Sequence, residues 1–174
     1  MVPVLETARL RLRAFRADDF DRWAGVLADP NVYRWLGGTA SGAEDTWRRV
    51  LASTGSWIVL GYGYWAVEAK EDGRLVGQVG FADFRREMTP SIEGLPEMGW
   101  ILAPDAHGKG YASEAVAAGL AWIDAAHRPA QVAAIIDPGN LPSIRVAEKA
   151  GFAEREEAVY RDAPILLFRR RTGP

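Results

Sequence analysis

Gly108, Lys109 and Gly110 have the types and the spacing of an anion-binding turn. They follow an apolar run that Pro104 ends, and they precede a helical pattern. The first N–H groups of a helix have no intrahelical acceptor and lie at the positive end of the helix dipole, so they attract anions. Glycine also lets the backbone approach a ligand without a Cβ in the way. The pattern favours a pyrophosphate site, to which Lys109 adds a point charge at the rim.

Two other phosphate-binding patterns fit this stretch less well. A P-loop needs a glycine where Ala103 stands, and a serine or threonine where Gly110 stands. The dinucleotide fingerprint G-x-G-x-x-G needs a third glycine where Ser113 stands. A tight turn between a strand and a helix, without any ligand, is the structural alternative.

Two motifs together carry a family resemblance. The stretch "HGKGYASEA", followed after one more predicted strand by "NLPSIRVAEKAGF", resembles the GNAT superfamily of acyl-CoA-dependent N-acetyltransferases. The closest similarity is to the branch of the ribosomal-protein N-terminal acetyltransferases, and it spans roughly Thr7 to Phe168. The resemblance implies transfer of an acetyl group from acetyl-CoA, without a metal, to a primary amine. That amine belongs to a protein N-terminus or to a small molecule.

The resemblance also implies a set of coenzyme-binding residues. Asn140 and Ser143 lie along the pantetheine and thiol end, although by themselves they read as a turn residue and a helix N-cap. Gly99 makes a β-bulge plausible in the strand that binds the amide arm and supplies an oxyanion donor, although an ordinary core strand would look the same. His107 stands where glutamine or arginine is usual in the family. The strand positions are Trp100, Ile101 and Leu102, and the pyrophosphate loop is His107, Gly108, Lys109, Gly110, Tyr111 and Ala112.

The reaction needs a neutral amine, a stabilised oxyanion and a protonated leaving thiol. Glu97, which opens the strand before the glycine loop, is the first candidate for the base, with Glu68 and Glu93 as alternatives. Many relatives carry a tyrosine as the acid at the position of Ala147. Without that tyrosine, the candidates for the acid are Ser143 and Tyr160. Unassisted release of the thiolate is a further alternative, because the pKa of a thiol is about 8.5.

The acceptor pocket is expected between the N-terminal helices and the last two strands. Tyr33 and Trp35 follow Pro30 in what reads as a loop, and loop aromatics often serve recognition. Glu93 and Glu97 can attract a cationic amine, and Glu68 completes the candidate acceptor residues. Three further aromatic residues are candidate walls, of which the first also fits a core helix face: Trp23, Trp57 and Trp65.

The elements that position these residues follow from periodicity. A strand at 9–15 precedes helices at 17–30 and 41–53, the second with Ser41 and Glu44 in capping-box spacing. A hairpin at 62–84, a strand–helix–strand unit at 97–137, a helix at 143–152 and two strands at 153–170 complete the chain. We expect one α/β (α+β) domain over residues 1–174. Its sheet is mixed and mostly antiparallel, with about six to seven strands and helices on both faces. By resemblance, the fourth and fifth strands splay apart.

Composition excludes several functions. The chain has no cysteine, so disulfides and thiolate metal sites are impossible and a cytoplasmic location is expected. A net charge of −2 argues against nucleic-acid binding, and the lack of a long apolar run argues against membrane spanning. The two histidines are far apart in the sequence, so no histidine cluster indicates a metal site. The aromatics of "YGYWAV" fit either a homodimer interface or a core. The remaining alternatives are a non-catalytic acyl-CoA-binding module and a nucleotide-binding protein.

Overall fold

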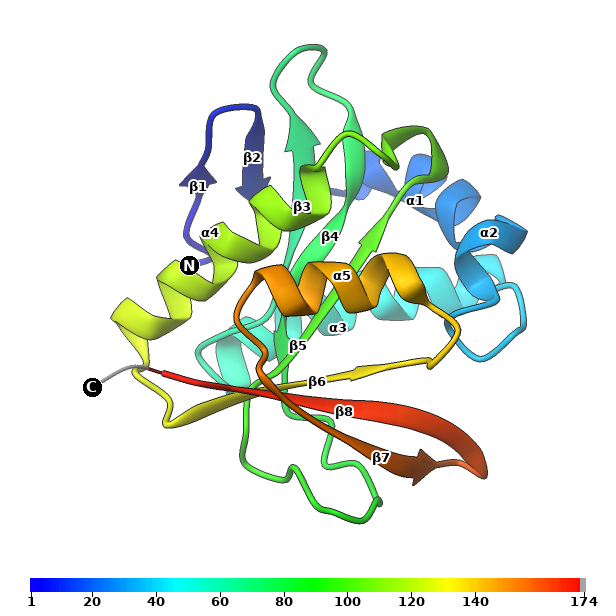
Figure 1. Cartoon of the computed structure of the whole chain (residues 1–174). Coiled ribbons are helices and arrows are strands. Elements are labelled where there is room, and N and C mark those ends of the chain that lie inside the picture. The colour runs from blue at the N-terminus through cyan, green and yellow to red at the C-terminus, as the bar shows by residue number, and fades with distance from the viewer. Residues whose placement is uncertain (173–174) are drawn as a thin grey trace.

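A single mixed sheet forms the centre of the molecule (Figure 1). The computed structural model of the chain describes residues 1–172. Within them the strand order is β1-β2-β3-β4-β5-β6-β8-β7, and every neighbouring pair is antiparallel except β5 and β6. The strands are β1 (Leu5–Glu6), β2 (Leu10–Arg13), β3 (Tyr64–Ala69), β4 (Leu75–Ala82), β5 (Glu97–Leu102), β6 (Gln131–Ile136), β7 (Glu154–Tyr160) and β8 (Ala163–Arg171). The expected mixed, mostly antiparallel sheet is confirmed, with the two-residue β1 as an additional edge strand.

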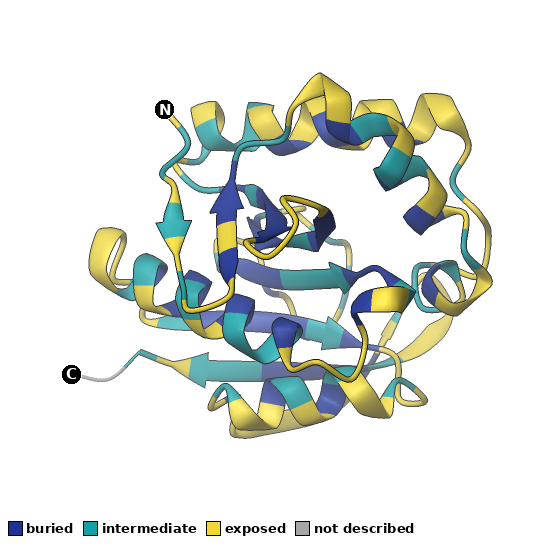
Figure 2. Ribbon diagram, turned by 90° about the horizontal axis from the view of Figure 1, so that it is seen from above, coloured by how far each residue is buried: buried dark blue, intermediate teal, exposed yellow. Residues whose placement is uncertain are grey.

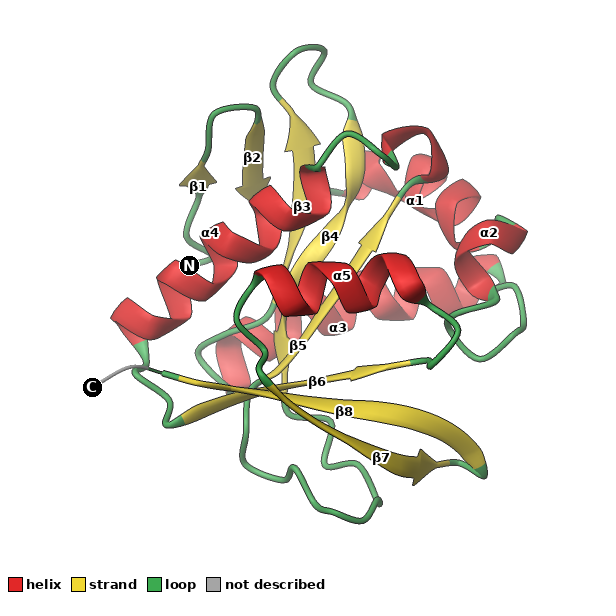
Figure 3. Ribbon diagram, in the orientation of Figure 1, coloured by secondary structure: helices red, strands yellow, loops and turns green. Residues whose placement is uncertain are grey.

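Helices cover both faces of this sheet, as expected (Figure 3). Helices α4 and α5 lie on one face, and α1, α2 and α3 lie on the other. Helix α4 crosses from β5 to β6, which makes these two strands the parallel pair of a βαβ unit. The helices are α1 (Phe20–Leu27), α2 (Pro30–Tyr33), α3 (Ala43–Val59), α4 (Tyr111–Ala126) and α5 (Leu141–Lys149).

Two expectations about the N-terminal helices are wrong. Pro30 does not open a loop but starts α2, because proline suits the first helical position and the Asp29 side chain accepts a hydrogen bond from the Asn31 N–H at 2.8 Å. The predicted capping box of Ser41 and Glu44 does not form. The N-cap residue of α3 is Gly42, without a side-chain cap, and the Glu44 carboxylate pairs with an arginine one turn later.

Most of the aromatic residues that were candidate walls of the acceptor pocket pack in the hydrophobic core. Trp23 and Trp65 are fully buried, and the Trp57 ring packs edge-on against Trp65 with centroids 4.7 Å apart. Trp122 of α4 completes this group, 5.1 Å from Trp65. Figure 2 shows the buried strands at the centre and the exposed outer faces of the helices around them. These tryptophans therefore hold helices to the sheet and are not walls of an acceptor pocket.

Glu68 takes part in a buried ion-pair network at the start of α1. Arg13 donates to the Glu68 carboxylate from Nε at 2.6 Å, and its two terminal nitrogens donate to Asp19 at 2.7 and 2.8 Å. Only 6 % of the Arg13 side chain and 8 % of the Glu68 side chain are exposed. Burial acts to raise the pKa of Asp19, but the hydrogen bonds from Arg13 and from the Arg16 N–H, together with the charges of both arginines, outweigh it, and the net shift is downward. The network fastens β2, β3 and the first helix to one another.

Replacing Arg13 with methionine should destabilise the protein by about 3–5 kcal/mol, because two buried carboxylates lose their shared partner. Urea unfolding at pH 7 measures this loss, with Arg11→Met as the control, since Arg11 is 45 % exposed and reaches Glu68 only at 3.3 Å. Acid offers a second measurement. A lowered pKa means that Asp19 stabilises the fold above its unfolded value of about 4, and this contribution is lost as pH falls through the folded value. An equal effect of the two substitutions would contradict this account.

Candidate active site

The parallel strands β5 and β6 separate almost as soon as they meet. Glu97 and Ala133 are the one residue pair in register between them in residues 1–172, supported by a 3.0 Å hydrogen bond from the Ala133 N–H to the Pro96 carbonyl. Beyond this pair the strands diverge, as Figure 1 shows. The expected splay is confirmed. It leaves one side of β5 without a neighbouring strand along most of its length.

The β-bulge expected at Gly99 is absent. Each of the six residues of β5 pairs with one residue of β4, from Glu97 opposite Ala82 to Leu102 opposite Gly77. Instead, the missing side chain of Gly99 leaves room for the Tyr64 side chain. A Cβ at position 99 would lie 2.5 Å from the hydroxyl oxygen of Tyr64, which β3 places against β5. Desolvation of that hydroxyl raises the pKa of Tyr64, and the charge of Glu97 raises it further.

The loop between β5 and α4 presents a row of free backbone donors. Gly108 and Gly110 have φ of 74° and 78°, values that only glycine adopts readily, and Gly110 is the N-cap of α4. Within residues 1–172, the six backbone N–H groups from Gly108 to Ser113 donate no well-formed hydrogen bond. Both glycines are exposed, and a Cβ on Gly108 would meet nothing within 4 Å. The loop thus offers an open cradle of donors at the positive end of a helix of 16 residues.

His107 anchors this loop to the preceding strand. Its Nε2 lies 3.0 Å from the carbonyl oxygen of Leu102, the last residue of β5. A carbonyl oxygen only accepts hydrogen bonds, so Nε2 carries the hydrogen and donates it. The histidine therefore fixes the base of the loop, while Lys109 is exposed beside the glycines.

The second motif lies at the start of α5. Asn140, not Ser143, is the N-cap of this helix, and the Asn140 Oδ1 accepts a hydrogen bond from the Ser143 N–H at 3.3 Å. Trp35 reaches the same place from the opposite layer. A Cβ on Gly139 would lie 3.4 Å from the Trp35 ring, so this ring packs on the loop that leads to Asn140. Ala147, at the position where the resemblance implies a tyrosine, is fully buried.

Glu97 lies in a compact cluster at the point where β5 and β6 part. The Arg86 side chain donates to both Glu97 carboxylate oxygens, from Nε at 2.6 Å and from Nη2 at 2.8 Å. The guanidinium also stacks on two rings, those of Phe84 and Tyr160, each 4.7 Å from its centroid. Burial acts to lower the pKa of Arg86, but the interactions with Glu97 and Tyr160 together outweigh it, and the net shift is upward. Two of the candidate catalytic residues, Glu97 and Tyr160, thus meet around one arginine.

Other candidate residues lie apart from this cluster. Glu68 belongs to the Arg13 network, and Glu93 is exposed in the loop between β4 and β5. Tyr33 is the half-buried last residue of α2. Sequence reasoning missed Arg86, because "FRREM" reads as an ordinary polar loop and nothing in its spacing points to Glu97.

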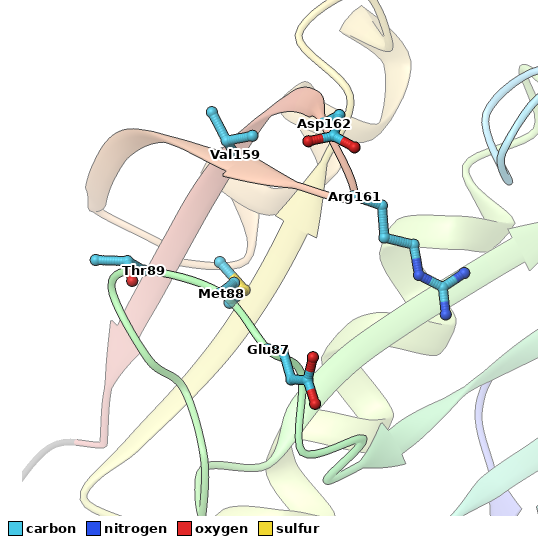
Figure 4. A pocket seen from close by; sticks show the side chains of 6 residues that line it. All are labelled: Glu87, Met88, Thr89, Val159, Arg161 and Asp162. Carbon is cyan, nitrogen blue, oxygen red and sulfur yellow. The ribbon is translucent and has the colours of Figure 1, made fainter.

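A shallow depression of about 560 Å³ flanks the Arg86 cluster. Figure 4 shows its two sides, one from the loop after β4 and one from the hairpin of β7 and β8. An isolated bridge between Thr89 and Val159 ties these two sides together. The lining residues are Glu87, Met88, Thr89, Val159, Arg161 and Asp162.

A glycine-rich loop at the start of a helix lies beside two parallel strands that diverge, and known proteins share this arrangement. A protein-family model described as an acetyltransferase (GNAT) domain matches residues 9–153. The chain belongs to the GNAT acetyltransferase family. The uncharacterized protein YkkB of Bacillus subtilis (strain 168) is 32 % identical over 97 % of this chain and 95 % of its own length. A GnaT-family protein of Bordetella pertussis has 31 % identity and a TM-score of 0.85, covering 97 % of this chain and 99 % of that chain.

A third protein shares the fold at lower identity. It is RimL, a ribosomal L7/L12 α-N-protein acetyltransferase in complex with coenzyme A, with 15 % identity and a TM-score of 0.72 over 97 % of this chain and 98 % of that chain.

In residues 1–172, no helix is both long and apolar enough to cross a membrane. The same residues contain no cluster of three or more acidic, histidine or cysteine side chains that could hold a metal ion.

Proposed function

We propose that this protein is an N-acetyltransferase that moves the acetyl group of acetyl-CoA to a primary amine by direct attack of the amine on the thioester. One observation carries the proposal. The gap between β5 and β6 begins at Glu97, and the six free N–H groups of the loop from Gly108 to Ser113 lie at the far end of β5. A donor with a pyrophosphate at one end and a thioester at the other fits this arrangement. RimL, which shares the fold, binds coenzyme A.

The donor site uses mostly backbone groups. The amides of the glycine loop hold the pyrophosphate, and the unpaired side of β5 at Trp100, Ile101 and Leu102 binds the amide arm. One N–H of this strand stabilises the oxyanion of the tetrahedral intermediate. Asn140 and Ser143 at the start of α5 face the thiol end. Backbone donors suit this task because they need no reorganisation during the reaction.

Glu97 is the proposed base. The amine nitrogen attacks the carbonyl carbon, and its proton passes to the Glu97 carboxylate directly or through one water. The C–S bond then breaks, and the leaving thiolate takes a proton from Ser143 or Tyr160. The Ser143 hydroxyl makes no hydrogen bond within the described residues, and Tyr160 stacks on the guanidinium that holds Glu97. Of these two candidates, Tyr160 is the one that contacts the arginine paired with the proposed base.

The acceptor amine enters from the face that carries α1, α2 and α3. Trp35, packed on Gly139, forms one wall, and Tyr33 lies two residues before it in the chain. The depression beside Arg86 forms another wall, and Glu93 in the exposed loop attracts a cationic amine. The acceptor class is a primary amine of a protein N-terminus or of a small molecule.

Calorimetry with acetyl-CoA, followed by thiol release against pooled amines, tests the proposal. The pools are peptides with free N-termini, amino acids, polyamines and aminoglycosides. We expect micromolar binding and thiol release with one pool. Binding without turnover in any pool would instead identify a non-catalytic acyl-CoA-binding module. Binding of ATP that coenzyme A does not displace would identify a nucleotide-binding protein.

A further inference from the structure

Arg9, which precedes β2, contacts the glycine loop from a distant part of the chain. Its Nη1 donates to the Lys109 carbonyl oxygen at 2.8 Å, and its Nε donates to the Glu114 carboxylate at 2.7 Å. Its backbone N–H donates to the same carboxylate at 2.9 Å. The guanidinium also lies over the Tyr111 ring, 4.9 Å from the centroid. One side chain therefore holds the loop, the first turn of α4 and the segment before β2 together.

The bond to Lys109 orients a peptide group that could otherwise turn. A trans peptide is planar, so the Lys109 carbonyl and the Gly110 N–H point in opposite directions. Arg9 holds the carbonyl, which fixes the Gly110 N–H on the side away from Arg9. Glycine at φ 78° has little conformational preference of its own, so the peptide before it needs an external restraint to keep one orientation.

Glu114 holds Arg9 in place and is itself held. The Thr7 hydroxyl donates at 2.6 Å to Glu114 Oε1, which also accepts the Arg9 backbone N–H, while Arg9 Nε donates to Oε2. Burial acts to raise the pKa of Glu114, but these hydrogen bonds outweigh it, and the net shift is downward. The carboxylate stays ionised at neutral pH and keeps Arg9 in its bridging position.

We propose that Arg9 is a positioning residue that presets the pyrophosphate loop for acetyl-CoA. The inference rests on the proposed function. Arg9 acts through the Lys109–Gly110 peptide and not through its charge alone. A side chain that only neutralises phosphate would need neither the bond to the Lys109 carbonyl nor the anchor on Glu114.

Two substitutions with opposite charge effects test this role by calorimetry with acetyl-CoA. Arg9→Met should weaken binding by about ten- to a hundredfold, because a charge-assisted hydrogen bond to the loop is lost. Glu114→Gln should also weaken binding, although it removes a negative charge near an anion site. If Arg9 acted only through its charge, Glu114→Gln would leave binding unchanged or tighten it, and this result would overturn the proposal. Arg11→Met is the control, since Arg11 is 45 % exposed against 48 % for Arg9.

Steady-state kinetics with two donors excludes a general loss of structure. For Arg9→Met, KM for acetyl-CoA should rise while kcat is retained. The value of kcat/KM for S-acetylpantetheine, which lacks the pyrophosphate, should stay at the wild-type level. Arg9→Lys should recover only part of the loss, because one ammonium cannot bridge Lys109 and Glu114 as the guanidinium fork does. Equal losses with both donors would overturn the proposal, and a wild-type protein that binds no acetyl-CoA would instead refute the proposed function.

Discussion

Replacing Gly110 with glutamate is expected to weaken acetyl-CoA binding by about a hundredfold or more. The backbone φ of 78° is strained for any residue with a Cβ, at about 1–2 kcal/mol. A carboxylate next to the pyrophosphate adds about 1–4 kcal/mol of repulsion for each charge at 4 Å, depending on the local dielectric. The new side chain also starts 3.4 Å from Arg9 Nη2, so it competes with the Lys109 carbonyl for that guanidinium. Calorimetry measures the loss directly.

Two further glycine variants separate charge from backbone strain. Gly110→Ala introduces the strain without the charge and should weaken binding by about tenfold. Gly73→Glu places the same side chain at φ 71° in the turn between β3 and β4, where a Cβ meets nothing within 4 Å. It should cost stability but leave binding intact. Binding of acetyl-CoA to Gly110→Glu at wild-type affinity would show that the glycine turn has no ligand.

Replacing Glu97 with glutamine should lower kcat by about 10²–10⁴-fold, the usual contribution of a general base, without weakening acetyl-CoA binding. Glutamine keeps the size of the side chain but cannot take the amine proton. It also leaves Arg86 without its anion, so the variant should unfold at a lower temperature. The kinetics are therefore measured at a temperature where circular dichroism shows the variant to be folded.

The same position offers a sharper test through chemical rescue. Glu97→Ala should regain part of its rate when formate is added, because a small carboxylate can bind Arg86 in the vacated space. Glu71→Gln is the matched control, an exposed carboxylate in the turn between β3 and β4, and it should retain kcat. If Glu97→Gln keeps full kcat and loses only stability, Glu97 serves as the partner of Arg86 and the base lies elsewhere.

The parts of this site that follow from local patterns could be predicted from the sequence. Gly108 and Gly110 indicate the loop before α4, because glycine adopts a positive φ much more readily than other residues. The apolar periodicity of 111–126 reveals the crossover helix, and so the parallel pair that it connects. Asn140 was identified by resemblance, but its capping role was assigned to Ser143. Both residue types cap helices well, and only the backbone angles decide between them.

The parts that depend on long-range approach could not be predicted. Gly99 looked like a bulge because the sequence cannot show that Tyr64 occupies the space beside it. Arg86 and Tyr160 are 74 positions apart and meet only because the β4–β5 loop packs on the β7–β8 hairpin. Glu68 looked available because the arginine that engages it lies 55 positions earlier in the chain. Charged side chains reveal their partners only in the folded structure.

Within residues 1–172, the single residue pair between β5 and β6 divides the sheet into two leaves that are joined at that point. Counted over the same residues, β1 to β5 form one leaf and β6, β8 and β7 form the other, and the backbone ladder supplies only this one pair across the joint. Side chains and one bridge span the joint instead: Arg86 to Tyr160, Thr89 to Val159, and Trp35 to Gly139. A molecule that wedges the leaves apart must stretch these ties, and one that draws them together must compress them. The proposed donor and acceptor sites share this joint, so we expect the binding of one to change the affinity for the other.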